Sequence, residues 1–165
     1  MKELRLRLLQ EMPIFGGITL VALHCMLDNC QVKSVSAGDF FFYEGDDANA
    51  MYVLEAGRVA VYRKWQSLDY KLREMSKGDC FGEMALMDFS HRSAAVKAIE
   101  DCSALEITPA QLQEVYARYP EQFTIIQMNM GREVCRRLRD ADHRLFLNDL
   151  EKYNICQSQQ AYHMF

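Results

Sequence analysis

Hydrophobic and polar positions follow three successive rhythms along the chain: helical, then strand-like, then helical again. Residues 2–10 mix charged and apolar side chains in the manner of a short amphipathic helix, which Pro13 and the glycines after Phe15 interrupt. Thr19 is a suitable N-cap for a second helix that runs to about Leu27. The pattern therefore predicts two helices at the N-terminal end.

From Gln31 to Ile107 short apolar runs alternate with turn residues, which is the rhythm of an antiparallel β protein. Strand-like composition recurs over residues 32–35, 40–43, 51–54, 58–62, 70–75, a run ending at 81–83, 92–98 and 104–107. The glycines between these runs, which suit tight turns, are Gly38, Gly45, Gly57, Gly78 and Gly82. This series of short strands predicts a jelly roll or barrel.

Two further helices are predicted after the strands. The segment 108–111 (Thr-Pro-Ala-Gln) combines an N-cap residue, a proline at the first helical position and a capping-box partner, so a helix begins there and reaches about Tyr116. A longer helix opens at Pro120 and runs to about Tyr153. The predicted fold class is α+β: an antiparallel β jelly-roll barrel flanked by N-terminal helices and a long C-terminal helix.

The later part of the long helix carries an apolar seam with coiled-coil spacing, formed by Val134, Leu138, Ala141 and Leu145. Such a seam suits packing on the barrel of its own chain as well as pairing with a second copy, so a homodimer through this helix is one of two expectations. Arginines on the same helix are interleaved with acidic residues, which is typical of a solvated face rather than of a stripe that binds DNA.

Length and charge narrow the class of protein. The 165 residues suit one domain over residues 1–150, followed by a polar tail over 151–165. A net charge of −4 disfavours non-specific binding to nucleic acid or to an anionic membrane, and no apolar run is long enough to span a membrane. The 15 residues after Leu150 are too few for a helix-turn-helix, so we expect no direct DNA binding.

Cysteine usage and the N-terminal residues indicate a compartment. The six cysteines are scattered without a C-x-x-C pair, as is typical of free thiols in a reducing environment. The first residues place charges among their leucines and have no uninterrupted apolar core, so they are no secretory signal. We therefore expect a cytoplasmic protein.

The segment from Gly78 to Val96 concentrates the residues with ligand-binding chemistry. It contains a glycine turn, Glu83, a short helical run to about Met87 and, nine residues after the glutamate, Arg92. An arginine fork and the N–H groups at a helix start both suit a phosphate. A carboxylate repels an anion, so Glu83 is expected to accept a hydrogen bond from a hydroxyl group such as that of a sugar. A ligand with both groups is a nucleotide.

The chain resembles the cyclic nucleotide-binding domain family over about residues 8–145. The most specific elements are Phe-Gly-Glu-Met-Ala-Leu at 81–86 and Arg-Ser-Ala-Ala-Val at 92–96, which are similar to the family's phosphate-binding cassette. The resemblance implies that Glu83 binds the ribose 2′-hydroxyl and that Arg92 binds the cyclic phosphate. It also implies a cradle of neighbouring residues around the ligand, here Gly82, Met84, Ala85, Ser93 and Ala94.

The base of the nucleotide stays open at this point. A hydroxyl residue at the position of Ser93 favours cGMP in some family members, yet bacterial cAMP binders also carry serine there. The central-helix positions that carry hydroxyls in bacterial cAMP receptors are occupied here by Ala141 and Asp142. Asp142 is able to accept from either purine, and Met75 is a candidate to pack on the base. We expect cAMP ahead of cGMP, and the sequence does not distinguish these from a cyclic dinucleotide.

The expected function is that of a stand-alone, non-enzymatic sensor, without a cofactor, that rearranges its helices to signal to an unidentified protein partner. The alternative is a jelly-roll interaction protein that binds no nucleotide. An enzyme is disfavoured because the four histidines are isolated in the sequence, whereas metal-dependent jelly-roll enzymes need a cluster of imidazoles.

Overall fold

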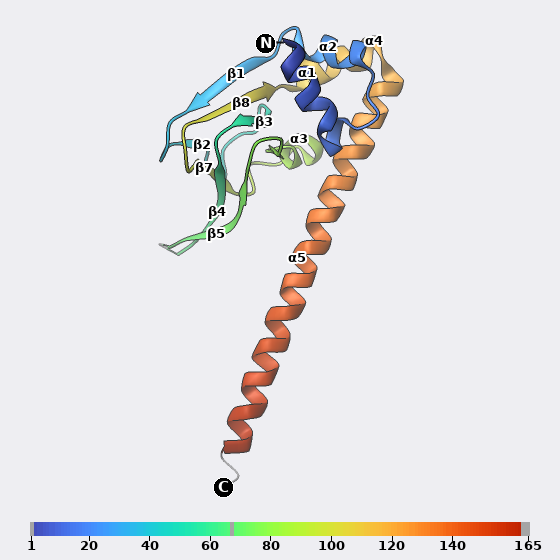
Figure 1. The fold of residues 1–165 in the computed structure, drawn as a ribbon. Helices are drawn as coiled ribbons and strands as arrows, with labels where there is room; N and C mark the ends of the chain where they lie inside the picture. Colours follow the sequence, from blue (N-terminus) through green and yellow to red (C-terminus); the bar gives the residue numbers. More distant parts are fainter. Residues whose placement is uncertain (1, 67, 163–165) are drawn as a thin grey trace. The chain divides into compact units, whose positions relative to one another are not determined.

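The computed structural model describes residues 2–66 and 68–162, and the order of its elements follows the predicted helices, strands and helices (Figure 1). The chain divides into two compact units, Met1–Met130 and Gly131–Phe165, and each is described by itself. The first unit holds the strands and most of the helices, and it contains the predicted ligand-binding segment.

Within the described residues, eight strands form two antiparallel four-stranded sheets, in the orders β1-β8-β3-β6 and β2-β7-β4-β5. The strands are β1 (Gln31–Val35), β2 (Phe40–Phe42), β3 (Met51–Ala56), β4 (Val59–Trp65), β5 (Leu68–Met75), β6 (Cys80–Phe81), β7 (Ala95–Ala98) and β8 (Cys102–Ile107). Both sheets contribute to one apolar core that includes Phe41, Tyr52, Val59 and Phe81. The predicted jelly roll is confirmed.

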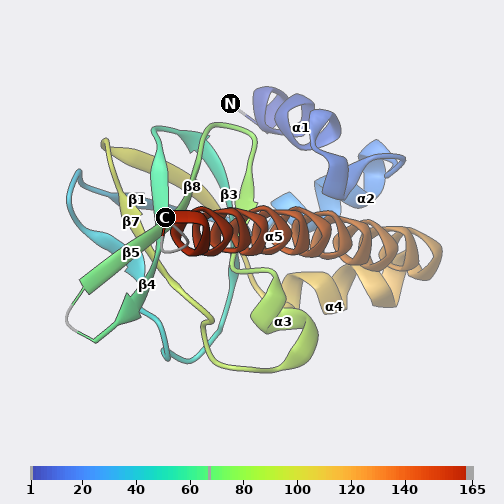
Figure 2. The same cartoon turned by 90° about the horizontal axis from the view of Figure 1, so that it is seen from below.

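The helices of the first unit cover a second core. They are α1 (Lys2–Glu11), the short 3-10 turn η1 (Pro13–Phe15), α2 (Leu20–Leu27), α3 (Met84–Asp88) and α4 (Pro109–Arg118). In Figure 2, α1, α2 and α4 gather beside the sheets. Leu9, Phe15 and Leu23 from this group pack with Leu105 and Ile107 of β8, so the helices are attached to the sheet by buried apolar surface.

The predicted start of α4 is confirmed in detail. The backbone N–H of Gln111 donates to Oγ1 of Thr108, and the backbone N–H of Thr108 donates to Oε1 of Gln111 at 2.7 Å. This reciprocal capping box satisfies two N–H groups that a helix start otherwise leaves without partners.

The last helix, α5 (Pro120–Tyr162), begins in the first unit and continues through the second. In the first unit Ile126 and Met130 are buried, and Nδ2 of Asn129 donates to the carbonyl oxygen of Gly16 at 2.9 Å. The predicted end near Tyr153 was too early. Residues 132–162 contain neither proline nor glycine, so nothing in the sequence interrupts the helix, and the described part of the predicted polar tail is helical. No described helix is both long and apolar enough to cross a membrane.

Several strand ends differ from the prediction by one to three residues, and the difference at the start of β7 bears on the site. β7 begins at Ala95 rather than at Arg92, because the backbone of Arg92 pairs with the turn before β3. Its N–H donates to the carbonyl oxygen of Asp46, and its carbonyl oxygen accepts from the N–H of Gly45, both at 2.9 Å. This pairing connects the glycine turn at 45–46 with Arg92, the residue that we expect to bind phosphate.

Candidate ligand-binding site

The predicted cassette, residues 78–96, is a strand end, a short helix and a loop. Gly82 follows β6 with a φ of +80°, a left-handed conformation that glycine adopts at little cost. Glu83 is the N-cap of α3, and its carbonyl oxygen accepts from the N–H groups of Leu86 and Met87 at 3.1 and 3.2 Å. The turn at Gly82 and these bonds place Glu83 where the chain passes from the sheet into α3.

Arg92 lies inside the protein, with only 3% of its surface exposed. Its Nη1 donates to the carbonyl oxygen of Gly82 at 2.9 Å, and its Nη2 donates to the carbonyl oxygen of Ala50 at 2.6 Å. The guanidinium lies over the ring of Phe42, 4.1 Å from its centroid, in a cation–π arrangement. Its Nε is buried without a hydrogen-bond partner among the described residues. The guanidinium is thus held in one orientation by β2, the residue before β3 and the cassette turn.

Burial sets the electrostatic character of Arg92. It lowers the pKa of the guanidinium from its ordinary value, while Tyr52, Asp46 and Glu83 act in the opposite direction. Arginine stays protonated in proteins, so a positive charge persists in a largely apolar environment. A buried cation of this kind is costly unless an anion or several acceptors compensate it, and a ligand phosphate would do so.

Aromatic rings form the floor beneath Arg92. The rings of Tyr52 and Phe81 stack with centroids 5.4 Å apart, and Phe41 meets Phe81 edge-on at 5.0 Å. Burial, followed by the charge of Glu106, raises the pKa of Tyr52 to about 12, and its hydroxyl donates to Oε1 of Glu106 at 3.1 Å. Tyr52 therefore stays neutral at physiological pH and serves as a packing surface.

Glu83 is completely buried, with 0% of its surface exposed. Burial of a carboxylate is unusual because the charge loses its hydration, and it is tolerated only where polar groups satisfy the oxygens. The sequence showed how many residues separate Glu83 from Arg92, but it did not show that Glu83 is buried. That the carboxylate accepts a hydrogen bond from a ligand hydroxyl remains a prediction.

A cavity of about 40 Å³ joins most of the predicted residues. It is lined by Gly82, Met84, Ala85, Arg92, Ser93 and Ala94 from the predicted set, and also by Phe42, Val61, Arg73, Phe81 and Val96. This cavity is much smaller than a nucleotide, so it accounts for only part of the space that a nucleotide would occupy. That these residues bind a ligand remains a prediction.

The two candidates for base contact belong to different units of the chain. Met75 is 6% exposed and packs in the apolar core of the two sheets, and it is not among the residues that line the cavity. Asp142 is an exposed residue of the second unit. Its part in ligand binding also stays a prediction.

The sequence did not single out Phe42, Val61 or Arg73. Their inward orientation depends on which strands pair and in what register, which strand composition alone does not determine. The available signal was the alternation of valines with other residues over 58–62. That alternation is obscured by a register shift between Val61 and Tyr62.

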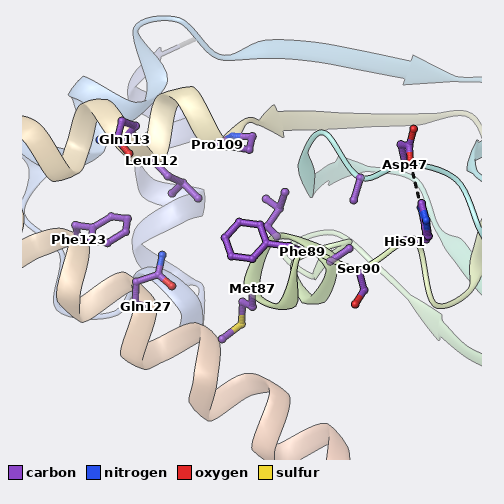
Figure 3. Close-up of a pocket in the computed structure, with 13 residues that line it drawn as sticks. Asp47, Met87, Phe89, Ser90, His91, Pro109, Leu112, Gln113, Phe123 and Gln127 are labelled. Atoms are coloured by element: carbon purple, nitrogen blue, oxygen red, sulfur yellow. Dashed lines mark ion pairs between the residues drawn. The ribbon is translucent and has the colours of Figure 1, made fainter.

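A second, larger cavity of about 700 Å³ lies between the cassette loop and the helices α4 and α5 (Figure 3). Leu112 of α4 and Phe123 of α5 line it opposite Phe89 and Met87. Phe89 has a φ of +55°, which is unfavourable for a bulky side chain, and is 94% exposed. The cassette and the first turns of α5 are therefore separated by space into which apolar side chains are able to move.

Comparison with known proteins identifies this architecture. The sequence profile described as "Cyclic nucleotide-binding domain" matches residues 32–119, which include β1 except its first residue, β2 to β8 and the cassette. The chain belongs to the cyclic nucleotide-binding domain family. The jelly roll, its flanking helices and the cassette are therefore those of a cyclic nucleotide-binding domain, and the predicted resemblance is confirmed.

The relatives of this domain include a bacterial protein and a fungal protein. It is 30% identical over 151 residues to the cyclic AMP receptor protein of Thermus thermophilus, covering 91% of this chain and 67% of that protein. It is 35% identical over 94 residues to a cAMP-dependent protein kinase regulatory subunit of Hypocrea atroviridis, covering 56% of this chain and 19% of that protein. The crystal structure of the Thermus thermophilus catabolite activator protein superposes with a TM-score of 0.71 at 30% identity, covering 82% of this chain and 62% of that one.

Proposed function

We propose that this domain is a non-enzymatic sensor that binds a cyclic purine mononucleotide through its cassette. The observation that carries the proposal is the burial of both Arg92 and Glu83 in the cassette, with the guanidinium of Arg92 bonded to the carbonyl oxygen of Gly82. The arginine supplies a fixed cation for the cyclic phosphate and the glutamate supplies an acceptor for a ribose hydroxyl. The names of two relatives, a cyclic AMP receptor protein and a cAMP-dependent kinase subunit, favour cAMP ahead of cGMP.

Signalling requires that ligand binding favours one arrangement of the helices over another. The cavity of about 700 Å³ between the cassette loop and the first turns of α5 supports such a change, because it leaves room for the cassette and these turns to approach each other. Closure would bury Phe89 against Leu112 and Phe123 and gain the free energy of removing apolar surface from water. An unidentified protein partner would then bind one arrangement of the helices in preference to the other.

Thermal unfolding with a panel of nucleotides tests the proposal. We expect the Tm to rise with the concentration of cAMP or cGMP, because a ligand that binds only the folded state stabilises it by about 2.7 kcal/mol at 100 times its Kd. 5′-AMP, which has the same base but no cyclic phosphate, serves as a matched control. Unchanged Tm and no heat in titration calorimetry with any cyclic nucleotide would favour the alternative, an interaction protein without a nucleotide.

We also propose that the second unit associates with a second copy of the chain. The observation that favours it is the exposure of apolar residues on the helix, with Leu138 59% and Leu145 61% exposed. Both belong to the apolar seam predicted from the sequence, and paired seams of this spacing bury such residues in coiled coils.

Sedimentation equilibrium checks this association. The chain with Leu138→Glu and Leu145→Glu is expected to sediment as a monomer at concentrations where the unaltered chain is a dimer, because a charge at a seam position loses its hydration on pairing. His143→Glu adds one negative charge to the same helix away from the seam and should leave the dimer intact. If the unaltered chain is itself a monomer, the proposal is contradicted, and the apolar seam would have to pack against something other than a second copy.

A further inference from the structure

The cavity of about 700 Å³ beside the cassette has the size and walls of a site for a small organic molecule. All of its lining residues belong to the first unit, and most of them are apolar. Phe89 of the cassette loop and Phe123 of α5 contribute aromatic rings (Figure 3). Leu112 adds aliphatic surface and Met87 adds a thioether. Small-molecule sites are concave and mostly apolar, with volumes of about 300–1,000 Å³, so this cavity suits a compound with aromatic rings.

Two glutamines supply hydrogen-bonding groups at this cavity. Gln113 lies on α4 and Gln127 on α5, and both line the cavity. Neither side chain makes a hydrogen bond to another residue in the part of the chain that the structure describes. Figure 3 shows the side chain of Gln127 extending from α5 toward Phe89. An amide offers both a donor and an acceptor, so these two side chains are able to orient a ligand that carries a carbonyl or hydroxyl group.

The charges at the rim of the cavity disfavour an ionic ligand. Its described lining includes one acidic residue, Asp47, and one histidine, His91. These two pair with each other, with Nδ1 of His91 3.0 Å from Oδ1 of Asp47 (Figure 3). No arginine or lysine is among the described residues that line the cavity, so an anion would find no cation of fixed charge there. The ligand class that fits is a neutral aromatic compound with a hydrogen-bonding group.

We propose that this cavity is a second, inhibitory site, where a neutral aromatic molecule binds and thereby opposes binding of the cyclic nucleotide at the cassette. The coupling rests on the proposed function, in which the nucleotide favours closure of the cassette onto the first turns of α5. Closure would bring Phe89 against Leu112 and Phe123 and so fill the space that the second ligand occupies. The two ligands favour different arrangements of the same segment, so each weakens binding of the other by the same factor.

Fluorescence titration of the full chain with Nile red tests the proposal. Nile red is a neutral aromatic dye with a ring carbonyl, and its emission rises in apolar surroundings. We expect one dye site, and saturating cAMP or cGMP should raise the Kd of the dye about tenfold, within the usual range of coupling between two sites. The Kd should then level off, because each ligand has its own site. Calorimetric titration of the nucleotide in the presence of the dye should give the same factor.

Variants of one helix locate the dye. Gln127→Trp fills the cavity from α5 and should weaken dye binding about tenfold or more. Met128→Trp adds the same side chain at the next position, which is 53% exposed and is not among the residues that line the cavity, so this matched control should leave the affinity unchanged. Gln127→Leu is close in size but lacks the amide, and the loss of one hydrogen bond should weaken the dye about three- to tenfold. Thermal unfolding without ligand shows that each variant is folded.

Contrary outcomes overturn the proposal in distinguishable ways. Equal dye binding by Gln127→Trp and the unaltered chain would place the dye elsewhere and refute the site. A dye Kd that keeps rising in proportion to nucleotide concentration would place both ligands in one site. A dye Kd that does not respond to a nucleotide whose binding calorimetry detects would refute the coupling. If calorimetry detects no cyclic nucleotide binding, the proposed function and the coupling fail together, and the dye titrations of the two tryptophan variants decide the site by themselves.

Discussion

Replacing Arg92 with alanine is expected to weaken binding of a cyclic nucleotide by roughly 30-fold or more, which corresponds to about 2 kcal/mol. The reason is the loss of a buried, oriented cation. Nη1 and Nη2 are already fixed by the carbonyl oxygens of Gly82 and Ala50, so little side-chain freedom is lost when a phosphate binds. Arg92→Lys keeps a charge but not the fork, and we expect an intermediate loss.

Titration calorimetry measures these affinities. The unfolding free energy without ligand has to be measured as well, because it shows whether the variant is folded. Alanine at position 92 removes the donor from the buried carbonyl of Ala50 and from the part-buried carbonyl of Gly82, and a buried group left unsatisfied costs about 1–3 kcal/mol of stability. The affinity should therefore be measured where the variant is still folded. Arg58→Ala removes an exposed arginine paired with Glu100 and is the control. Equal affinity of Arg92→Ala and the unaltered chain would refute the assignment of the phosphate site.

Features that depend on neighbouring residues were predictable from the sequence. Turn glycines and the capping box at Thr108 act within a few residues, so the order of strands and the start of α4 followed from local pattern. The roles proposed for Glu83 and Arg92 came from the chemistry of two side chains and their spacing. The family resemblance added the neighbouring residues, most of which the fold brings to one cavity.

Features that depend on long-range pairing were not predictable. Arg73 becomes a neighbour of Arg92 only when β5 pairs with β4 and β4 with β7, and a register shift decides which residues of the hairpin face inward. The left-handed conformation of Phe89 has no sequence signal either, because a bulky aromatic residue is the opposite of what such a position favours. The length of α5 was also underestimated. A helix continues where no residue interrupts it, and such an absence is a weaker signal in a sequence than a proline or glycine.

Gly82→Ala is expected to weaken nucleotide binding about tenfold or more, although position 82 offers no side chain to a ligand. A Cβ added there would lie 2.6 Å from Nη1 of Arg92, well inside contact distance. The backbone would resist movement because it leads directly into α3, whereas the end of the arginine side chain is able to shift. The guanidinium would therefore leave the orientation in which it meets a phosphate, and its bond to the carbonyl oxygen of Gly82 would be lost.

Gly78→Ala separates this effect from backbone strain. Gly78 has a φ of +93°, close to the +80° of Gly82, but an added Cβ there meets no atom within 4 Å. Both variants should lose about 1–2 kcal/mol of unfolding free energy, since alanine is disfavoured in the left-handed region. Only Gly82→Ala should lose affinity in titration calorimetry. A similar loss in both variants would mean that strain in the cassette, rather than the position of Arg92, limits binding; no loss in either would show that Arg92 tolerates displacement.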